Sequence, residues 1–149
     1  MKLQNGTQQA SLFFKLLPLD WQESIVPNWD FYKNKGAQIW LLSNKDDICA
    51  GGILFKAAAP EMDMFKSTAQ HWFDLGYLYI AYVWVPVRHR DKGCGSQWIQ
   101  AVLQQFPKQG FWLTTEEKGL RNFYEKNHFK YLESLQAAEI EEELFVYQP

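Results

Sequence analysis

The sequence has little of several features that would mark a specialised class of protein. Its 149 residues include two cysteines, Cys49 and Cys94, too few and too far apart for a disulfide scaffold or a cysteine-rich metal site. No apolar run approaches the roughly 20 residues of a membrane-spanning helix, and no signal peptide is recognisable. Linkers, repeats and low-complexity blocks are also missing. We therefore expect one cytoplasmic domain over residues 1–149, with no membrane contact and no metal.

The chain also lacks an excess of either charge. Fifteen Lys and Arg residues stand against 17 Asp and Glu residues, which gives a formal net charge of −2. Such a balance provides no general attraction for nucleic acid or for an anionic membrane surface, so any anion site must be local. Hydrophobic residues make up 47% of the chain and aromatic residues 17%, which excludes disorder and predicts a substantial core.

Apolar runs and their spacing predict a mixed α/β (α+β) domain. Strands are predicted at 11–17, 37–43, 48–57, 77–87 and 110–115, with two more in "HFKYLES" and "IEEELFVYQ". Helices are predicted at 20–36 (one or two, broken near Pro27), 60–76, 96–106 and 118–127. The run "YLYIAYVWVPV" (77–87) is apolar or aromatic nearly throughout, which is typical of a central strand covered on both faces.

The stretch "RHRDKGCGSQW" (88–98) places basic residues and two glycines between this strand and a helix. At such a turn, unpaired backbone N–H groups and the positive end of the helix dipole point outward together. Phosphate is their natural ligand, and glycines let it approach the main chain closely. The alternative interpretation is a tight turn that binds nothing.

Two familiar phosphate-binding loops do not fit this stretch. A P-loop ends in Gly-Lys-Ser/Thr, whereas here Gly95 is followed by Ser96 and Gln97. A dinucleotide fingerprint needs a third small residue where this chain has Trp98. The strand, helix, strand order is instead that of a crossover we expect to be parallel and right-handed.

Read as a whole, "WVPVRHRDKGCGSQWIQAVLQQF" resembles the acetyl-CoA-binding motif of the GNAT superfamily of N-acetyltransferases. That motif, Arg/Gln-x-x-Gly-x-Gly/Ala, is matched by residues 90–95, and "LRNFYEKNHF" (120–129) looks like the family's later "FYEK-x-GF" block. Residues 77–132 carry the specific evidence. The resemblance implies a mixed, mostly antiparallel sheet of six to seven strands, about four helices, and a central strand that splays from its neighbour.

The resemblance also implies acetyl-CoA as cosubstrate, with its pyrophosphate against the turn. The coenzyme-binding positions carried over are Val85, Val87, Arg90, Asp91, Lys92, Gly93, Cys94, Gly95, Ser96 and Asn122. Pantetheine would run beside the central strand, where the backbone N–H of Val85 would polarise the thioester carbonyl. The side chains of Arg88, Arg90 and Lys92 either assist with phosphate charge or form a solvated basic edge.

The implied reaction is direct attack of an amine on the thioester within one ternary complex, with Tyr124 and Val85 as the catalytic positions. A lysine-like amine has a pKa of about 10.4, so a base or a chain of waters must take its proton. Tyr124 matches the family's general acid at the departing thiolate, and its other reading is a core aromatic. The central strand holds no carboxylate, so the base stays open among Tyr79, Tyr82, Glu116, Glu117, His71 and His89.

Two positions depart from the family pattern. Glu117 stands where many relatives have an Asn that contacts pantetheine, and His128 stands where a Gly usually follows "FYEK-x". Asn127 is therefore expected to supply the left-handed helix end. Together with the missing carboxylate, Glu117 supports an alternative function: a catalytically weak or inactive module that binds coenzyme A or a partner.

The acceptor is expected to be a primary amine of a small molecule or a peptide. Its site should lie between residues 20–36, residues 57–76 and the end of the central strand. Aromatic residues of this region either form its wall or belong to the core: Trp21, Trp29, Phe31, Tyr32, Trp72 and Phe73. No acidic cluster is visible in the sequence that would indicate a polyamine pocket. A homodimer is the remaining prediction about partners.

Overall fold

The fold is built on one seven-stranded sheet, in the order β1-β2-β3-β4-β5-β7-β6. The computed structural model describes the backbone of residues 1–149 and all side chains except those of residues 60 and 61. The strands are β1 (Lys2–Asn5), β2 (Gln38–Asn44), β3 (Asp47–Phe55), β4 (Leu78–Trp84), β5 (Phe111–Thr115), β6 (Lys130–Ala137) and β7 (Ile140–Tyr147). The α-helices are α1 (Ala10–Phe14), α2 (Leu19–Ile25), α3 (Trp29–Asn34), α4 (Lys66–Asp74), α5 (Cys94–Gln105) and α6 (Arg121–Lys126). The predicted mixed, mostly antiparallel sheet is confirmed.

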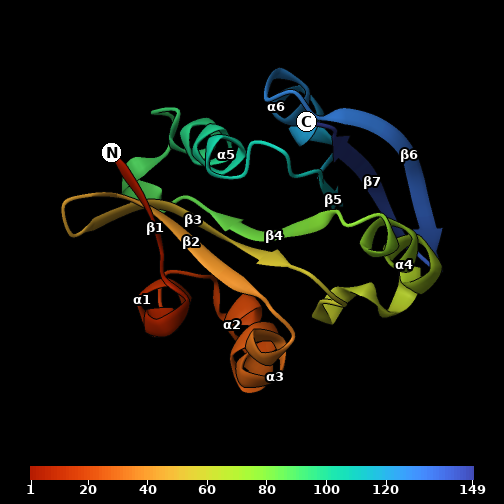
Figure 1. Ribbon diagram of the computed structural model, residues 1–149, viewed down its shortest axis with the longest axis horizontal. Helices are drawn as coiled ribbons and strands as arrows, with labels where there is room; N and C mark the ends of the chain where they lie inside the picture. The colour runs from red at the N-terminus through yellow and green to blue at the C-terminus, as the bar shows by residue number, and fades with distance from the viewer.

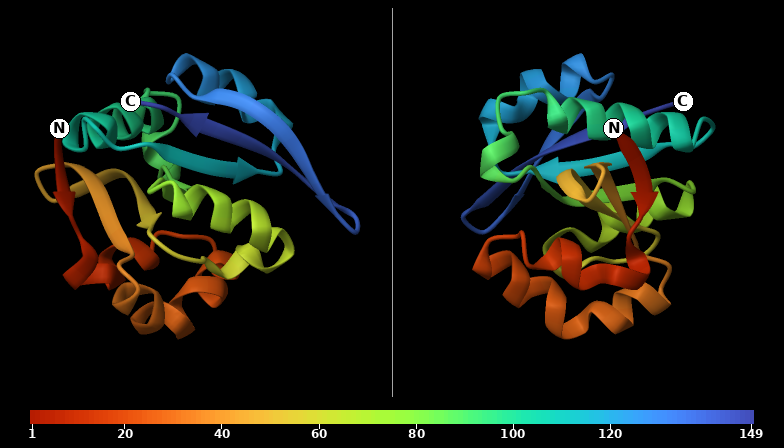
Figure 2. Two further views of the ribbon diagram at one scale, coloured as in Figure 1. Left: turned by 45° about the vertical axis from the view of Figure 1, so that its right-hand side comes forward. Right: turned by 90° about the vertical axis from the view of Figure 1, so that its left-hand side faces the viewer.

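Helices cover both faces of the sheet, and each face has its own core (Figures 1 and 2). On one face α1 to α4 pack around residues such as Phe13, Ile53 and Trp112. On the other, α5 and α6 pack around residues such as Trp98 and Phe145. Because strand residues alternate between the faces, the two cores share the same strands.

The central strand β4 separates from its parallel neighbour β5 after two residues. It pairs with β3 along most of its length, but with β5 only at Leu78↔Phe111 and Tyr79↔Trp112. Beyond these pairs a β-bulge kinks the strand, and its residue Tyr82 has a φ of +56°, which is rare for a side chain of this size. The predicted splay is confirmed, and it opens a gap within the sheet.

The prediction of a first strand at 11–17 is wrong. These residues contain α1, and the first strand is β1, a short edge strand paired antiparallel with β2. The buried residues Phe13, Phe14 and Leu17 are spaced as on one side of a helix, a pattern hidden by the short apolar run. β1 ("KLQN") is polar and mostly exposed, so it gives no apolar signal.

The other predicted elements are present with adjusted bounds. The 20–36 segment forms α2 and α3, separated by a 3-10 turn (Val26–Asn28) that contains Pro27. The 60–76 segment begins with a 3-10 helix (Pro60–Phe65) before α4. Six α-helices therefore stand where about four were expected, because α1 was taken for a strand and 20–36 is divided. Within the described chain, no helix is long and apolar enough to cross a membrane.

Candidate active site

A cleft of about 480 Å³ occupies the gap between β4 and β5. It is lined by residues 79–83 of β4, by Thr114 and Thr115 of β5 and by Glu142 of β7. The remaining lining residues are Asp20, Trp21, Ser24, Glu116, Glu117, Leu120 and Tyr124. Since α2 lies on one face of the sheet and α6 on the other (Figure 1), the lining residues come from both faces.

The glycine turn lies on the α5–α6 face. Gly93 has a φ of +78° and precedes α5, whose N-terminus is not capped by any side chain. The first hydrogen bond of the helix runs from the N–H of Gln97 to the carbonyl of Gly93, 3.0 Å away. The N–H groups of Cys94, Gly95 and Ser96 thus have no acceptor within the helix. An uncapped 12-residue helix behind a left-handed glycine is a suitable anion cradle.

The second glycine has a packing role. A Cβ atom on Gly95 would lie 3.2 Å from Cζ of Phe123 and 3.8 Å from Cγ2 of Val85. The first turn of α5 therefore approaches α6 and the end of β4 closely. Asn127 strengthens this contact, since its Nδ2 donates to Oγ of Ser96 at 3.0 Å and its Oδ1 accepts from Gln100 at 3.1 Å.

The basic side chains of the turn all contact the protein itself. Arg88 forms an ion pair with Asp47 of the β2–β3 hairpin. The Nε of Arg90 donates to the carbonyl of Val85 at 3.1 Å, and its guanidinium lies over the ring of Trp84. Lys92 donates to the carbonyl of Arg88 at 3.2 Å. In this structure they brace the turn, and the free donors are the backbone N–H groups.

None of the ten predicted coenzyme positions lines the cleft: seven form the glycine turn, and the other three lie just after β4 or on α6. β4 ends at Trp84, so Val85 follows the strand, and Val87 begins a 3-10 turn (Val87–His89) with an exposed side chain. Asn122 is exposed on α6. None of the three lines the cleft, which β4 borders through residues 79–83. Their contact with coenzyme A stays a prediction.

Tyr124 lies at the cleft on the same face as the glycine turn. Its ring packs against Phe123, Phe129 and Phe145 at centroid distances of 5.1, 6.1 and 5.3 Å. Burial, and to a lesser degree the charge of Glu117, raises the pKa of Tyr124 to about 12. The phenol therefore stays protonated at neutral pH, and it can donate a hydrogen bond to an atom in the cleft.

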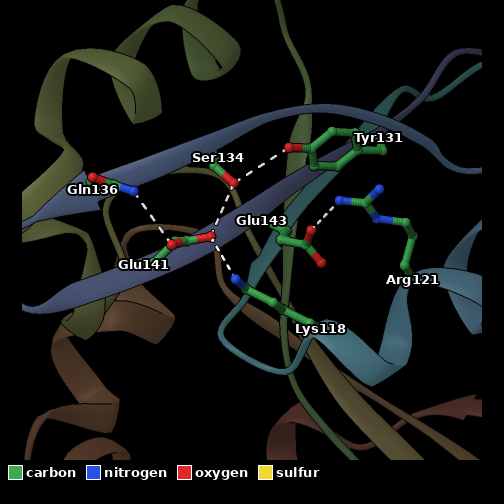
Figure 3. A network of polar contacts seen from close by, with 7 residues as sticks. All are labelled: Lys118, Arg121, Tyr131, Ser134, Gln136, Glu141 and Glu143. Atoms are coloured by element: carbon green, nitrogen blue, oxygen red, sulfur yellow. Dashed lines mark hydrogen bonds and ion pairs between the residues drawn. The ribbon is translucent and has the colours of Figure 1, made fainter.

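The α6 segment that carries Tyr124 is fastened to the β6–β7 hairpin (Figure 3). Arg121 pairs with the buried carboxylate of Glu143, and its guanidinium lies 3.9 Å from the ring centroid of Tyr131. Lys118 pairs with Glu141 at 3.1 Å, and Glu141 also accepts from Ser134 and Gln136. These contacts fix the position of α6 and of its tyrosine relative to β7.

The helix end beyond Tyr124 corrects one expectation. His128 adopts the left-handed conformation itself, with a φ of +74°, whereas Asn127 has a φ of −98°. The N–H of Phe129 donates to the carbonyl of Tyr124 at 3.0 Å, which closes the helix. A histidine rather than Asn127 thus supplies the left-handed residue at the end of α6.

The opposite face of the cleft is formed by aromatic and acidic side chains. Trp21 of α2 makes edge contacts with Tyr82 and Trp84, and the hydroxyls of Ser24 and Tyr82 are 2.8 Å apart. Of the six aromatic residues considered from sequence, only Trp21 lines the cleft. Trp29, Tyr32, Trp72 and Phe73 pack in or against the core, which was the alternative interpretation of these residues. Phe31 is exposed.

Four carboxylates converge on the cleft from three parts of the chain. Asp20, Glu116 and Glu117 are exposed at its rim, whereas Glu142 is half-buried. Burial raises the pKa of Glu142, and the nearby charge of Glu116 raises it further, while a hydrogen bond from Thr114 opposes both. The described lining contains no Lys, Arg or His. The acidic cluster that the sequence did not reveal is assembled by the fold.

The histidines and cysteines lie outside the cleft. His71 is on α4, and Nε2 of His89 lies 2.9 Å from Asp47, so neither of these candidate bases is at the cleft. Asp47, Cys49 and His89 bring ligand-type atoms within 4.8 Å of one another, a convergence that the sequence spacing did not suggest. Burial raises the pKa of the Cys94 thiol, which disfavours a nucleophilic thiolate there.

The fold is that of several solved GNAT proteins. A GNAT-family protein from Desulfovibrio desulfuricans aligns with a TM-score of 0.69 and 14% identity, covering 99% of this chain and 98% of that one. One from Bacteroides thetaiotaomicron gives 0.65 and 14% identity, covering 100% and 88%. A GNAT-family acetyltransferase from Elizabethkingia anophelis, solved with acetyl-CoA bound, gives 0.54 and 15% identity over 80% of each chain.

The sequence itself establishes the family. Residues 8–129 match the model of the acetyltransferase (GNAT) family, which is most of the chain. Among curated proteins, none matches the sequence. The chain belongs to the acetyltransferase (GNAT) family, and its activity is acyl-CoA-dependent acetyl transfer.

Proposed function

We propose that this protein transfers an acetyl group from acetyl-CoA to a primary amine of a small molecule or peptide, by direct attack within a ternary complex. The observation that carries the proposal is the cleft through the sheet. It joins the face that holds the glycine turn and Tyr124 to the face that holds Trp21, Asp20 and Glu142. Each substrate can therefore enter from its own side and meet the other between β4 and β5.

The donor would bind on the α5–α6 face. Its pyrophosphate would lie against the N–H groups of Cys94, Gly95 and Ser96, where the helix end supplies partial positive charge. The pantetheine would follow the open side of β4 toward Tyr124. The strand's own N–H groups near its bulge are the nearest candidates to polarise the thioester carbonyl, at residues 81–83, together with the predicted N–H of Val85 just beyond the strand.

In the chemical step, the amine nitrogen would form a C–N bond to the acetyl carbon as the C–S bond breaks. The products are an N-acetylamine, coenzyme A with its free thiol, and one proton from the ammonium form of the acceptor. Tyr124 would donate a hydrogen bond to the departing sulfur. Since a thiolate is a strong acceptor, such a charge-assisted bond stabilises it more than a neutral hydrogen bond would.

The acceptor would enter from the α2 side, beside Trp21. Four carboxylates and no basic residue line the cleft, so its field attracts an ammonium group. The wall formed by Trp21 and Tyr82 suits the carbon skeleton of the amine or its positive charge. Both features support an amine acceptor rather than an acid.

The test is a thermal-shift titration with acetyl-CoA, followed by an assay of thiol release with a panel of amines. We expect acetyl-CoA to raise the Tm in a saturable way, and at least one amine to release the thiol and yield its N-acetyl product by mass spectrometry. A chain that binds acetyl-CoA but acetylates none of the amines would instead be the inactive coenzyme-binding module. A chain that does not bind it would refute both functions.

A further inference from the structure

The reaction needs a proton acceptor on the amine side, and β4 carries no carboxylate that could take this role. The cleft is lined by a carboxylate from another strand. Glu142 of β7 is the half-buried carboxylate of the lining, whereas Asp20, Glu116 and Glu117 are exposed at the rim. A partly desolvated carboxylate in contact with the cleft is well suited to take a proton from a bound ammonium group.

Glu142 faces the side of the sheet from which the acceptor would enter. On β7, Leu144 and Val146 belong to the core under α1 to α4, so Glu142, at even spacing from them, points to that face. Tyr124 belongs to the core on the other face. The carboxylate and the phenol therefore border one cleft from opposite faces of the sheet.

A chain of hydroxyl groups holds Glu142 in place. Oγ1 of Thr114 donates to Oε1 of Glu142 at 3.2 Å, and the hydroxyl of Tyr79 lies 3.0 Å from Thr114 Oγ1. A threonine hydroxyl has one hydrogen to donate, so Tyr79 donates to Thr114 while Thr114 donates to the carboxylate. This arrangement fixes one oxygen and favours the charged, proton-accepting form of Glu142.

We propose that Glu142 is the proton acceptor for the attacking amine, and that Thr114, backed by Tyr79, is its positioning residue. The ammonium group of the acceptor passes one proton to Oε of Glu142 and becomes a neutral nucleophile. Its nitrogen then bonds to the acetyl carbon as the C–S bond breaks. The nitrogen's second proton ends on the coenzyme thiol, and Glu142 later releases its proton to water.

Other titratable groups face the same cleft and bear on its pH dependence. They are Asp20 from α2, Tyr79 and Tyr82 from β4, Glu116 and Glu117 after β5, and Tyr124 from α6. Glu116 raises the pKa of Glu142 by charge repulsion. Ionisation of Glu116 therefore shifts the limb of the pH–rate profile that Glu142 produces, and does not replace that limb. No described basic side chain lines the cleft, so no positive charge in the lining lowers the pKa of Glu142.

The experiment compares wild type with Glu142→Gln on two matched alkylamines. One is basic, and the other carries an electron-withdrawing group that leaves its amine uncharged at neutral pH. With the basic amine we expect kcat/KM to fall about 100-fold at pH 7, and the loss to shrink as the pH approaches the pKa of the amine. With the neutral amine the variant should stay within about threefold of wild type, because no proton must be removed before attack.

Further variants separate this role from a structural one. Thr114→Val removes the hydrogen bond that lowers the pKa of Glu142, so the rising limb of the pH–rate profile should move to higher pH. Glu139→Gln, in the exposed turn between β6 and β7, should behave as wild type. The Tm and its response to acetyl-CoA serve as the folding control for each variant.

Two outcomes would overturn the role of Glu142: unchanged activity of Glu142→Gln on the basic amine, or an equal loss on both amines. The proposal rests on the proposed acetyl transfer, and the two can fail separately. If wild type acetylates no amine, the proposed function fails and the role of Glu142 fails with it. If wild type is active and the variant shows either outcome above, only the role of Glu142 fails.

Discussion

The two faces of the cleft are built from different parts of the polypeptide. On the α5–α6 face, the unpaired donors are main-chain N–H groups at one helix end, held by glycine conformation and close packing. On the α1–α4 face, the groups at the cleft are side chains from distant parts of the chain, such as Trp21 of α2 and Glu142 of β7. The first arrangement depends on backbone conformation, whereas the second depends on which side chains occupy a few positions.

The largest expected effect comes from disturbing the main-chain N–H groups at the start of α5. Gly93→Asp places a negative charge at the anion cradle, so we expect acetyl-CoA to bind at least about 100-fold more weakly, or about 2.7 kcal/mol. Gly76→Asp is the matched control, because Gly76 also has a positive φ of +84° and no atom near its missing Cβ. Calorimetric titration of both variants with acetyl-CoA provides the measurement. Equal weakening by the two would show that backbone strain, and not the cradle, is responsible.

The next largest effect concerns the phenol of Tyr124, which lines the cleft. Tyr124→Phe should lower kcat by roughly 100-fold while leaving the affinity for acetyl-CoA nearly unchanged, because it removes one hydrogen-bond donor. Since the pKa of Tyr124 is raised to about 12, wild type should show no loss of the donor below that pH. Tyr131→Phe is the control, because the hydroxyl of Tyr131 contacts Ser134 at the surface and does not line the cleft. Steady-state kinetics measured across pH test this role of Tyr124. A kcat of Tyr124→Phe equal to that of wild type would exclude it.

A smaller effect sharpens the side-chain half of the comparison. Trp21→Ala should raise the KM of the amine about tenfold, since it removes a wall of the acceptor side worth roughly 1.4 kcal/mol of binding. The thermal shift with acetyl-CoA should not change. The control is Phe31→Ala in α3, because the side chain of Phe31 is 57% exposed and lies outside the cleft. This variant should keep the wild-type KM for the amine and the wild-type thermal shift with acetyl-CoA. A change in coenzyme binding with Trp21→Ala would mean that the two faces are not separate.

The smallest expected effect is on stability. Glu142 has a raised pKa in the folded protein, so ionising it costs folding free energy as the pH rises through the range between its unfolded and folded pKa values. Glu142→Gln removes that cost and still accepts the hydrogen bond from Thr114. Its Tm at neutral pH should therefore be no lower than that of wild type, and the difference should vanish in acid. A clearly lower Tm would indicate that the ionised carboxylate stabilises the fold.

The same contrast explains how much of the molecule could be predicted from its sequence. The glycine turn before α5 and the "NFYEK" helix are each continuous in sequence, and residues 37–57 and 77–127 have clear apolar patterns, so the secondary structure of these segments was predicted closely. Glu116 and Glu117 were among the candidate bases named from the sequence, and both line the cleft. Their convergence with Asp20 and Glu142 was not predicted, because the packing of α2 and the order of strands in the sheet bring these distant positions together.

Local conformation accounts for the remaining differences. β4 loses its pairing with β5 after Tyr79 and has its bulge at Tyr82, and no residue type in "YLYIAYVWVPV" indicates either position. A histidine in a left-handed turn at His128 and a polar edge strand at residues 2–5 are both set by their neighbours rather than by their own preferences. Tertiary contacts override weak local signals in each case.

The alternation of β7 has a consequence for how such an enzyme can change over generations. Glu142 and Glu143 are adjacent in the chain, yet one faces the cleft and the other pairs with Arg121 to hold the helix of Tyr124. Because neighbouring residues of a strand point to opposite faces, a substitution at 142 leaves the support at 143 untouched. The residue that faces the cleft can thus be exchanged without breaking the ion pair that holds the helix of Tyr124, although a single peptide bond joins the two positions.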